Sequence, residues 1–177
     1  MKVYYCLHKI DDRIKGPIRS TNQKELQSIP MSNKKIEAWK VHVGNGKTIF
    51  VATKVKTINP VVDAIVKNLC EIDLIQYVRI SQEDIQASNE IKIKGRIKIP
   101  ISTTGHPSAV GVHLTLDFAP NTIQFFEITS AVKGYGKKLV QAVMTALPDE
   151  WEACVVMDYS EGFWDKMAGK YDRIVIL

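Results

Sequence analysis

The chain has 177 residues, enough for one domain with its own hydrophobic core, and we therefore expect a single domain over residues 1–177. Hydrophobic residues make up 45% and charged residues 24%, which excludes a wholly disordered chain. The net charge of +5 is milder than that of most nucleic-acid binders, but it also suits an enzyme that takes an anionic cofactor.

The three cysteines, Cys6, Cys70 and Cys154, lie far apart within apolar runs, which is typical of reduced core thiols. No cluster of Cys and His has the spacing of a zinc site, so we expect no metal. The first residues hold no long apolar stretch, and no segment approaches the roughly 18 apolar residues of a membrane span. These features together predict a cytoplasmic protein that does not bind membranes.

The N-terminal half predicts a strand, a polar loop and then a β-hairpin. Residues 3–7 are apolar enough for a short strand, and residues 11–22 form a basic, polar loop. Two β-rich runs, residues 36–43 and 48–55, flank the sequence Gly44-Asn45-Gly46-Lys47. An Asn-Gly turn between two such runs is a strong hairpin signal.

A helix is expected from Asn59-Pro60 to about Asp73. Asn can accept hydrogen bonds from the free amides of the first turn, and Pro suits the first helical position. The apolar residues recur every four positions and form a stripe along one side: Val61, Val62, Ile65, Val66, Leu69 and Cys70. Residues 76–80 then predict a short strand.

Residues 91–101 alternate strictly between apolar and basic positions, which predicts one strand with a buried face. The opposite face would carry four cations: Lys92, Lys94, Arg96 and Lys98. That face is either simply solvated or a surface for an anionic partner, a nucleic acid included. The following residues, 100–107, read as a loop.

Two further strands are expected at residues 110–118 and 122–128, joined by Ala119-Pro120-Asn121. The apolar phase of the second strand changes along its length. Ile123 and Phe125 would share one face, and Phe126 and Ile128 the other. This pattern fits either a strand that is buried on both faces or a β-bulge.

The C-terminal part predicts helix, strand, helix and strand. The first helix covers residues 134–147 and ends before Pro148, and an apolar strand follows at residues 151–157. Ser160 can cap a short helix to about Met167, and residues 171–177 form the final strand. The passage from residue 122 to 157 is therefore a βαβ unit, whose two strands run parallel.

The sequence from Ala131 to Leu139 places two glycines where this strand meets the helix. Glycine lets the backbone approach a ligand closely, and the first amides of a helix lack internal partners. These amides and the helix dipole attract phosphates, although the glycines can also be purely structural. Lysines at 133, 137 and 138 oppose the dipole, which favours the phosphate interpretation. The spacing is neither a dinucleotide fingerprint nor a P-loop.

These residues resemble a known family. Val132-Lys133-Gly134-Tyr135-Gly136, followed by two residues and then Leu139, is similar to motif A of the Gcn5-related N-acetyltransferases (GNAT), Gln/Arg-x-x-Gly-x-Gly/Ala. The stretch from Ser160 to Met167 resembles the later helix of that family, in which an aromatic pair precedes Glu-Lys-Leu/Met. The resemblance covers residues 91–177, the acetyl-CoA-binding core, and leaves residues 1–90 as a divergent half.

The resemblance implies an α/β (α+β) fold with a mixed, mostly antiparallel sheet flanked by helices. It also implies that the βαβ unit binds acetyl-CoA. Backbone groups of Phe126 and Ile128 would contact the pantetheine arm, and Phe163 and Trp164 would flank the cofactor. The pyrophosphate would be held by the amides of the glycine loop: Lys133, Gly134, Tyr135, Gly136 and Lys137.

The implied reaction is the attack of a neutral primary amine on the thioester, which needs a base and a proton donor for the leaving thiolate. Tyr159 is the candidate donor and Glu127 the candidate base; Asp117, His106 and His113 are weaker candidates. The chain departs from the family pattern at Ala131, where Gln or Arg is usual, and at Trp164, where a donor tyrosine often stands.

These departures keep two alternatives open beside an N-acetyltransferase acting on a small molecule or a protein. One is a catalytically inactive GNAT-like binding or assembly protein. The other is a nucleic-acid-associated protein that uses the four cations of residues 92–98. The sequence leaves open whether the chain forms a homodimer.

Overall fold

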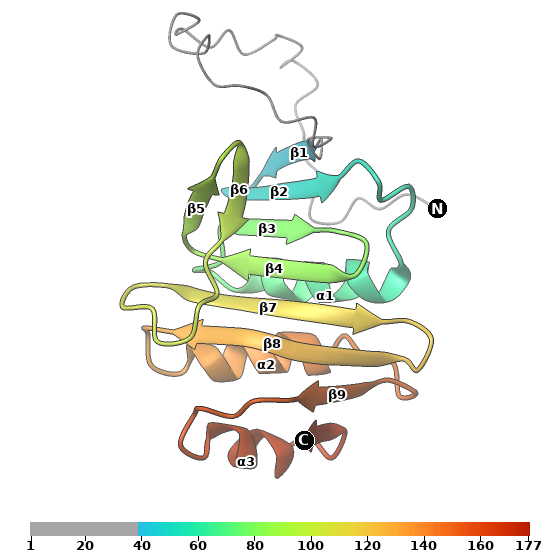
Figure 1. Cartoon of the computed structure of the whole chain (residues 1–177), viewed down its shortest axis with the longest axis vertical. Helices are drawn as coiled ribbons and strands as arrows, with labels where there is room; N and C mark the ends of the chain where they lie inside the picture. The colour runs from blue at the N-terminus through green and yellow to red at the C-terminus, as the bar shows by residue number, and fades with distance from the viewer. Residues whose placement is uncertain (1–38) are drawn as a thin grey trace, which may run out of the picture.

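A computed structural model of the chain describes residues 39–177, which form a mixed sheet with three helices (Figure 1). The predicted strand at residues 3–7, the loop at 11–22 and the start of the first hairpin strand lie outside the described residues. The elements, in chain order, are β1 (Trp39–Gly44), β2 (Lys47–Ala52), α1 (Pro60–Glu71), β3 (Tyr77–Ile80), β4 (Asp84–Ser88), β5 (Ile91–Lys94), β6 (Ile97–Pro100), β7 (Val110–Asp117), β8 (Thr122–Ser130), α2 (Tyr135–Met144), β9 (Glu152–Val155), α3 (Phe163–Ala168) and β10 (Ile174–Ile176).

Eight strands form one sheet in the order β1-β2-β3-β4-β7-β8-β9-β10, and β5 and β6 form a separate two-stranded sheet. The pairs β2–β3, β8–β9 and β9–β10 are parallel, and the other neighbours are antiparallel. Each parallel pair is joined by a connection that contains a helix, as parallel strands require. The predicted mixed, mostly antiparallel α/β architecture is therefore confirmed.

Helix α1 begins where the sequence predicts. The Asn59 side chain accepts a hydrogen bond from the Val61 amide at 2.8 Å, and Pro60 occupies the first turn. Asn68 on α1 donates to the Ala142 carbonyl on α2 at 3.0 Å, so the two helices lie side by side. Figure 1 shows both behind the sheet, which leaves its near face without a helix.

The core lies between this helix pair and the sheet. One cluster of buried apolar side chains extends from Ile49 on β2 to Ile174 on β10. The predicted stripe of α2 is buried in it, including Leu139, Val143 and Leu147, although the helix itself ends at Met144. Whether residues 1–177 form a single domain stays a prediction, because residues 1–38 are outside the described part.

The first hairpin is confirmed over its described residues. β1 and β2 are antiparallel, with Gly44 opposite Lys47. Asn45 and Gly46 form the turn between them with φ angles of 51° and 73°. Two successive positive φ angles are what the favoured two-residue hairpin turn requires, and Asn-Gly supplies them at low cost.

The phase change in the second strand of the βαβ unit is a β-bulge. Leu114 pairs with Phe125, whereas His113 pairs with Glu127, so Phe126 has no partner on β7. The extra residue turns Ile128 toward the core, against which it packs. The expectation that Phe126 and Ile128 share a face is therefore wrong, because the bulge shifts the alternation by one residue.

Two predictions about the middle of the chain are also wrong. Residues 91–101 form not one strand but the hairpin β5–β6, which turns at Gly95 with φ of 63°. Its apolar residues are poorly buried, and 72% of the Ile93 side chain is exposed. β4 has no counterpart in the sequence prediction, because only Ile85 and Ala87 are apolar among its five residues.

The hairpin also divides the four predicted cations. Lys92 pairs with Ile99 and Lys94 with Ile97, so these two lysines share one face of the hairpin. Lys98 pairs with Ile93 and lies on the opposite face, while Arg96 sits in the turn. Paired residues point to the same side of a ribbon, so a single cationic face over Lys92, Lys94, Arg96 and Lys98 does not form.

No helix within residues 39–177 combines the length and apolar character needed to span a membrane.

The close approach of β7 to its neighbours generates a stability prediction. A methyl group at Gly111 would collide with the Ile101 carbonyl oxygen and lie 2.9 Å from the Ala87 carbonyl oxygen. We expect Gly111→Ala to destabilise the fold by about 3 kcal/mol, since backbone atoms cannot move aside easily. Gly169→Ala, at a helical φ of −66°, should change stability by less than about 1 kcal/mol. Denaturant unfolding measures both, and equal effects would contradict the expectation.

Candidate functional site

The strands β8 and β9 pair over a short distance only. Thr122, Ile123 and Gln124 of β8 pair with Glu152, Ala153 and Cys154 of β9, but β8 continues to Ser130. β9 ends at Val155, and the chain then runs beneath the remaining part of β8 toward α3 (Figure 1). Residues 125–130 therefore have no partner strand on the side of β9.

Two cavities lie along this unpaired stretch. The first, which we call the splay cavity, has a volume of about 260 Å³. It is lined by Thr103, Thr104, Phe125, Phe126, Glu127, Ile128, Met157, Tyr159, Ser160 and Trp164. The second, the loop cavity, has about 270 Å³ and is lined by Thr104, Gly105, His106, Ile128, Thr129, Ser130, Gly136, Ser160 and Phe163. The two share Thr104, Ile128 and Ser160, so they are adjacent and lead toward the start of α2.

The glycine loop has the geometry of an anion site. Gly134 precedes α2 with φ of 89°, a conformation that glycine adopts without strain, and no side chain caps the helix. Among residues 39–177, the amides of Gly136 and Lys137 donate to no acceptor. No acidic residue lies in the first turn of α2, while Lys133 and Lys137 are exposed beside it. Free amides and cations at one helix end favour a bound phosphate.

Tyr135 plays a different part from its neighbours. Its hydroxyl donates to both carboxylate oxygens of Asp73, at 3.0 and 2.8 Å, and so ties α2 to the end of α1. This hydrogen bond, with the nearby charge of Lys138, lowers the pKa of Asp73. The Tyr135 side chain is thus directed away from both cavities, and only its backbone is available to the loop.

Gly136 lies where the loop packs against α3. A Cβ atom there would lie 3.4 Å from the ring of Phe163, so the two helices approach closely at this point. Phe163 lines the loop cavity, whereas Trp164 is buried and packs on Phe125 with ring centroids 4.9 Å apart. The predicted aromatic pair therefore forms one wall of the opening.

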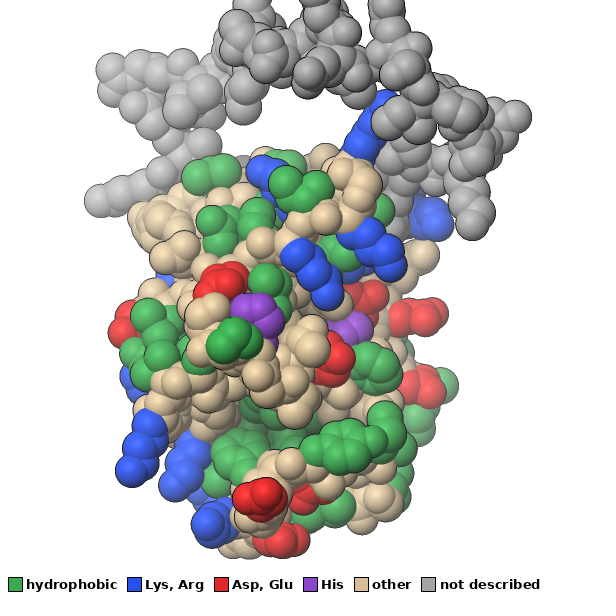
Figure 2. All heavy atoms as spheres, turned by 60° about the vertical axis from the view of Figure 1, so that its left-hand side comes forward, with side chains coloured by type: hydrophobic (Ala, Val, Ile, Leu, Met, Phe, Trp, Pro, Cys, Tyr) green, Lys and Arg blue, Asp and Glu red, His purple; other side chains and the backbone are tan. Residues whose placement is uncertain are grey.

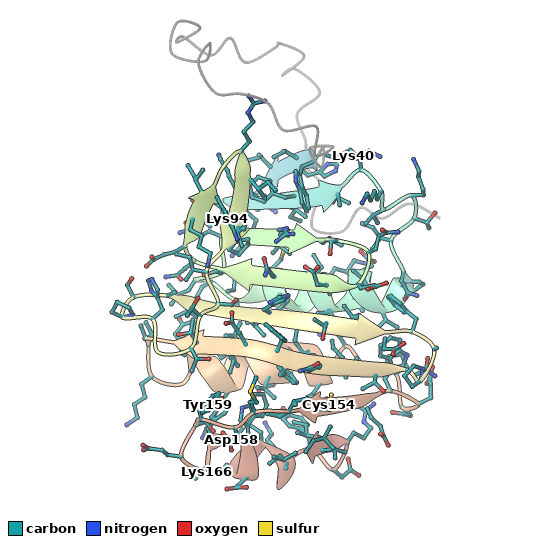
Figure 3. The ribbon with its side chains drawn as sticks, in the orientation of Figure 1. Lys40, Lys94, Cys154, Asp158, Tyr159 and Lys166 are labelled. Carbon is teal, nitrogen blue, oxygen red and sulfur yellow. The ribbon has the colours of Figure 1, made fainter. Side chains whose placement is uncertain are left out.

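The two candidate catalytic residues line the same splay cavity. Tyr159 is 74% exposed, and its hydroxyl lies 3.3 Å from the sulfur of Met157. Figure 3 shows it on the segment beneath the unpaired part of β8. Glu127 accepts a hydrogen bond from the Ser102 hydroxyl at 3.1 Å. A donor and a carboxylate on two walls of one cavity can serve a reaction that moves protons in both directions.

A further cavity lies on the sheet face that has no helix. His113 borders it, on β7, with its ring 5.0 Å from that of Phe126 and its Nε2 atom 3.9 Å from Asp84. Burial lowers the pKa of His113, and the charge of Arg79 acts in the same direction. The carboxylates of Asp84 and Glu127 raise it in part.

The other weak candidates have structural contacts. The Nδ1 atom of His106 accepts hydrogen bonds from the amides of Ser108 and Ala109, at 3.4 and 3.2 Å. Asp117 accepts one from the Ala119 amide at 3.2 Å and so fixes the turn after β7. No three His, Cys, Asp or Glu side chains among residues 39–177 are grouped so that they could hold a metal ion.

The structure thus brings together most of the residues that the sequence singled out. Phe126, Glu127, Ile128, Tyr159 and Trp164 line the splay cavity, and Gly136 and Phe163 the loop cavity. Lys133, Gly134, Tyr135 and Lys137 line neither cavity and surround the start of α2 instead. Thr103 and Thr104, which the sequence analysis treated only as loop, also line the splay cavity; nothing in their pattern signals this.

Comparison of the chain with protein-family models, with curated proteins and with solved structures found no match to any of them.

The partly buried side chain of His113 gives a pH prediction. Because the pKa of His113 is lower in the folded chain than the value near 6.5 of an unfolded one, the stability it contributes is complete above that value. This stability is lost as the pH falls through 6.5 toward the folded pKa, since protons then bind the unfolded chain preferentially. In His113→Gln, the drop in melting temperature between pH 7.5 and 5.5 should be smaller than in the parent. An equal or larger drop would contradict the assignment.

Proposed function

We propose that the chain binds acetyl-CoA between β8 and β9 and transfers the acetyl group to a primary amine, as an N-acetyltransferase of the GNAT type. The acyl-pantetheine arm would occupy the splay and loop cavities. The pyrophosphate would rest on the amides that begin α2. The resemblance of the glycine loop and of the later helix to GNAT motifs supports this assignment.

The observation that carries the proposal is the opening of β8 from β9 after only three paired residues. A strand inside a sheet normally pairs on both sides, since unpaired backbone groups cost free energy when they are buried. Here the β9 side of residues 125–130 is open to two cavities that end at an uncapped helix. An extended ligand with amide groups at one end and phosphates at the other suits this arrangement.

The chemistry would need two proton transfers. Glu127 would take a proton from the amine, directly or through a water, as the nitrogen attacks the thioester carbonyl. Tyr159 would give a proton to the leaving thiolate. In this arrangement Trp164 supplies packing against Phe125 and no proton transfer.

A second candidate is a protein that binds an acyl-CoA without catalysis. The observation that favours it is the burial of Trp164, the residue that the family resemblance aligns with a donor tyrosine. In that case the residues around the glycine loop would still bind the cofactor, and Tyr159 would be a surface aromatic only.

Cofactor binding can be tested at Gly134. We expect the parent to bind acetyl-CoA in an isothermal titration and Gly134→Glu to bind at least tenfold more weakly. Glutamate there strains a backbone with φ of 89° and places a negative charge beside the phosphates.

Gly46→Glu is the matched control, because Gly46 also has a positive φ, 73°, and open space around it, but lies in the β1–β2 turn. It should bind acetyl-CoA within twofold of the parent. Absence of binding by the parent at millimolar acetyl-CoA would remove the proposed function.

Catalysis can be tested at Tyr159. With a pool of primary amines, thiol release from acetyl-CoA by Tyr159→Phe should be about 100-fold slower than by the parent, while acetyl-CoA affinity stays unchanged. Tyr171→Phe is the control, since Tyr171 packs against the core away from both cavities. Full activity of Tyr159→Phe would exclude it as the proton donor, and absence of thiol release by the parent with intact acetyl-CoA binding would favour the second candidate.

A further inference from the structure

The cavity on the face without a helix has a volume of about 860 Å³, within the range of small-molecule sites. Its floor is one row of cross-strand neighbours from four strands. Asp84 of β4 pairs with Thr115 of β7, which pairs with Gln124 of β8, and Gln124 pairs with Cys154 of β9. In Figure 2, acidic and histidine side chains gather across the middle of the visible face.

The lining of this cavity is acidic. It contains Glu83, Asp84 and Asp117 and no lysine or arginine. Within residues 39–177, neither Glu83 nor Asp117 forms an ion pair, and the Oδ1 atom of Asp84 is buried without a hydrogen-bond partner. Carboxylates that no cation balances produce a field that concentrates positively charged ligands.

The cation that lowers the pKa of His113 is already engaged. Arg79 acts on His113 but donates to Gln86 Oε1 at 3.0 Å and stacks over the ring of Trp39 at 4.8 Å. His113 borders the cavity, and burial favours its neutral form. The negative charges of the exposed Glu83 and Asp117 therefore stay available to a ligand.

Part of the lining is apolar and includes Leu116, Phe118, Pro120 and Phe126. The faces of aromatic rings attract organic cations, and apolar walls pack against methylene groups. This combination suits a flexible aliphatic chain that carries ammonium groups. It suits neither a phosphate-bearing nor a carboxylate-bearing ligand.

The bulge joins this cavity to the proposed cofactor site. Phe126, the residue without a partner on β7, is 49% exposed and lines both this cavity and the splay cavity. A ligand in the acidic cavity would therefore lie next to an acyl group in the splay cavity.

We propose that the acidic cavity, bordered by Glu83, Asp84, Asp117 and Phe126, binds the acetyl acceptor and that this acceptor is a small aliphatic polyamine. The acceptor role rests on the proposed function. One nitrogen, in its neutral amine form, attacks the thioester carbonyl, forms the C–N bond and gives one proton to the base. The C–S bond then breaks, and the thiolate takes a proton from the donor, while the other ammonium groups remain beside the carboxylates.

The test is titration of the full chain with spermidine, without acetyl-CoA, followed by calorimetry or NMR at low salt. The double variant Glu83→Gln/Asp117→Asn removes two charges, and Asn keeps an oxygen for the Ala119 amide. It should bind spermidine roughly tenfold more weakly than the parent. Glu71→Gln/Asp172→Asn removes the same net charge at exposed sites outside the cavity and should bind within twofold of the parent. The neutral 1,8-octanediol should not bind.

Absence of spermidine binding by the parent, or an equal loss in both double variants, would overturn the inference even if acetyl-CoA binds at the glycine loop. Spermidine binding that depends on Glu83 and Asp117, together with thiol release from acetyl-CoA, supports the whole proposal. The same binding without any binding of acetyl-CoA would overturn the acceptor role and the proposed function, while the cavity would stand as a polyamine site.

Discussion

The backbone of β8 sets the main constraint on this molecule, because it pairs with β7 along its whole length and with β9 at three residues only. The strand is central to the sheet and yet has a free edge for more than half of its residues. An edge of this kind normally needs protection, since its amides and carbonyls can pair with any extended chain. In this fold the segment after β9, the loop before β7 and α3 enclose the edge without forming a strand ladder with it, although Thr104 donates a hydrogen bond to the Ile128 carbonyl at 3.4 Å. The enclosed space forms the splay and loop cavities.

The bulge at Phe126 decides which side chains face which side of this edge. In an unbroken alternation with Ile123 and Phe125, Glu127 would point to the face that the helices cover, where an unpaired carboxylate would be costly. One extra residue moves Glu127 into register with His113 and returns Ile128 to the core side. The same residue displaces Phe126 to the border between two cavities. The single inserted residue thus keeps Ile128 on the core side of β8 and places the polar side chain of Glu127 on the face without a helix.

The sequence predicted those elements whose terminal or turn residues have a strong conformational preference of their own. Asn59-Pro60 and Asn45-Gly46 each fix a local geometry, so α1 and the first hairpin follow from them.

The β5–β6 hairpin was not predicted, because a two-residue turn leaves the alternation of isoleucine and lysine unbroken across Gly95. The turn nevertheless exchanges the faces on which the isoleucines and the lysines lie. β4 was not predicted because a central strand can bury Gln86 when a neighbouring strand supplies a hydrogen bond, here from Arg79, and a pattern of residue types does not reveal that neighbour. The acidic cavity is lined in part by Asp84 of β4, so the sequence did not predict this cavity either.

The glycine loop was predictable because its signal is local, whereas the cavities depend on where β9 stops. The apolar run from Trp151 to Met157 suggests a strand of seven residues, but pairing ends at Val155, and Val156 and Met157 are exposed. Beyond them the Asp158 side chain accepts hydrogen bonds from the Ser160 amide and hydroxyl, and the Ser160 oxygen accepts one from the Trp164 amide, so a tight turn leads into α3. These local bonds compete with the ladder that a longer β9 would form with β8. The residues that start α3 are thus also the ones that keep β8 and β9 apart, which links the segment from Ser160 to the opening it borders.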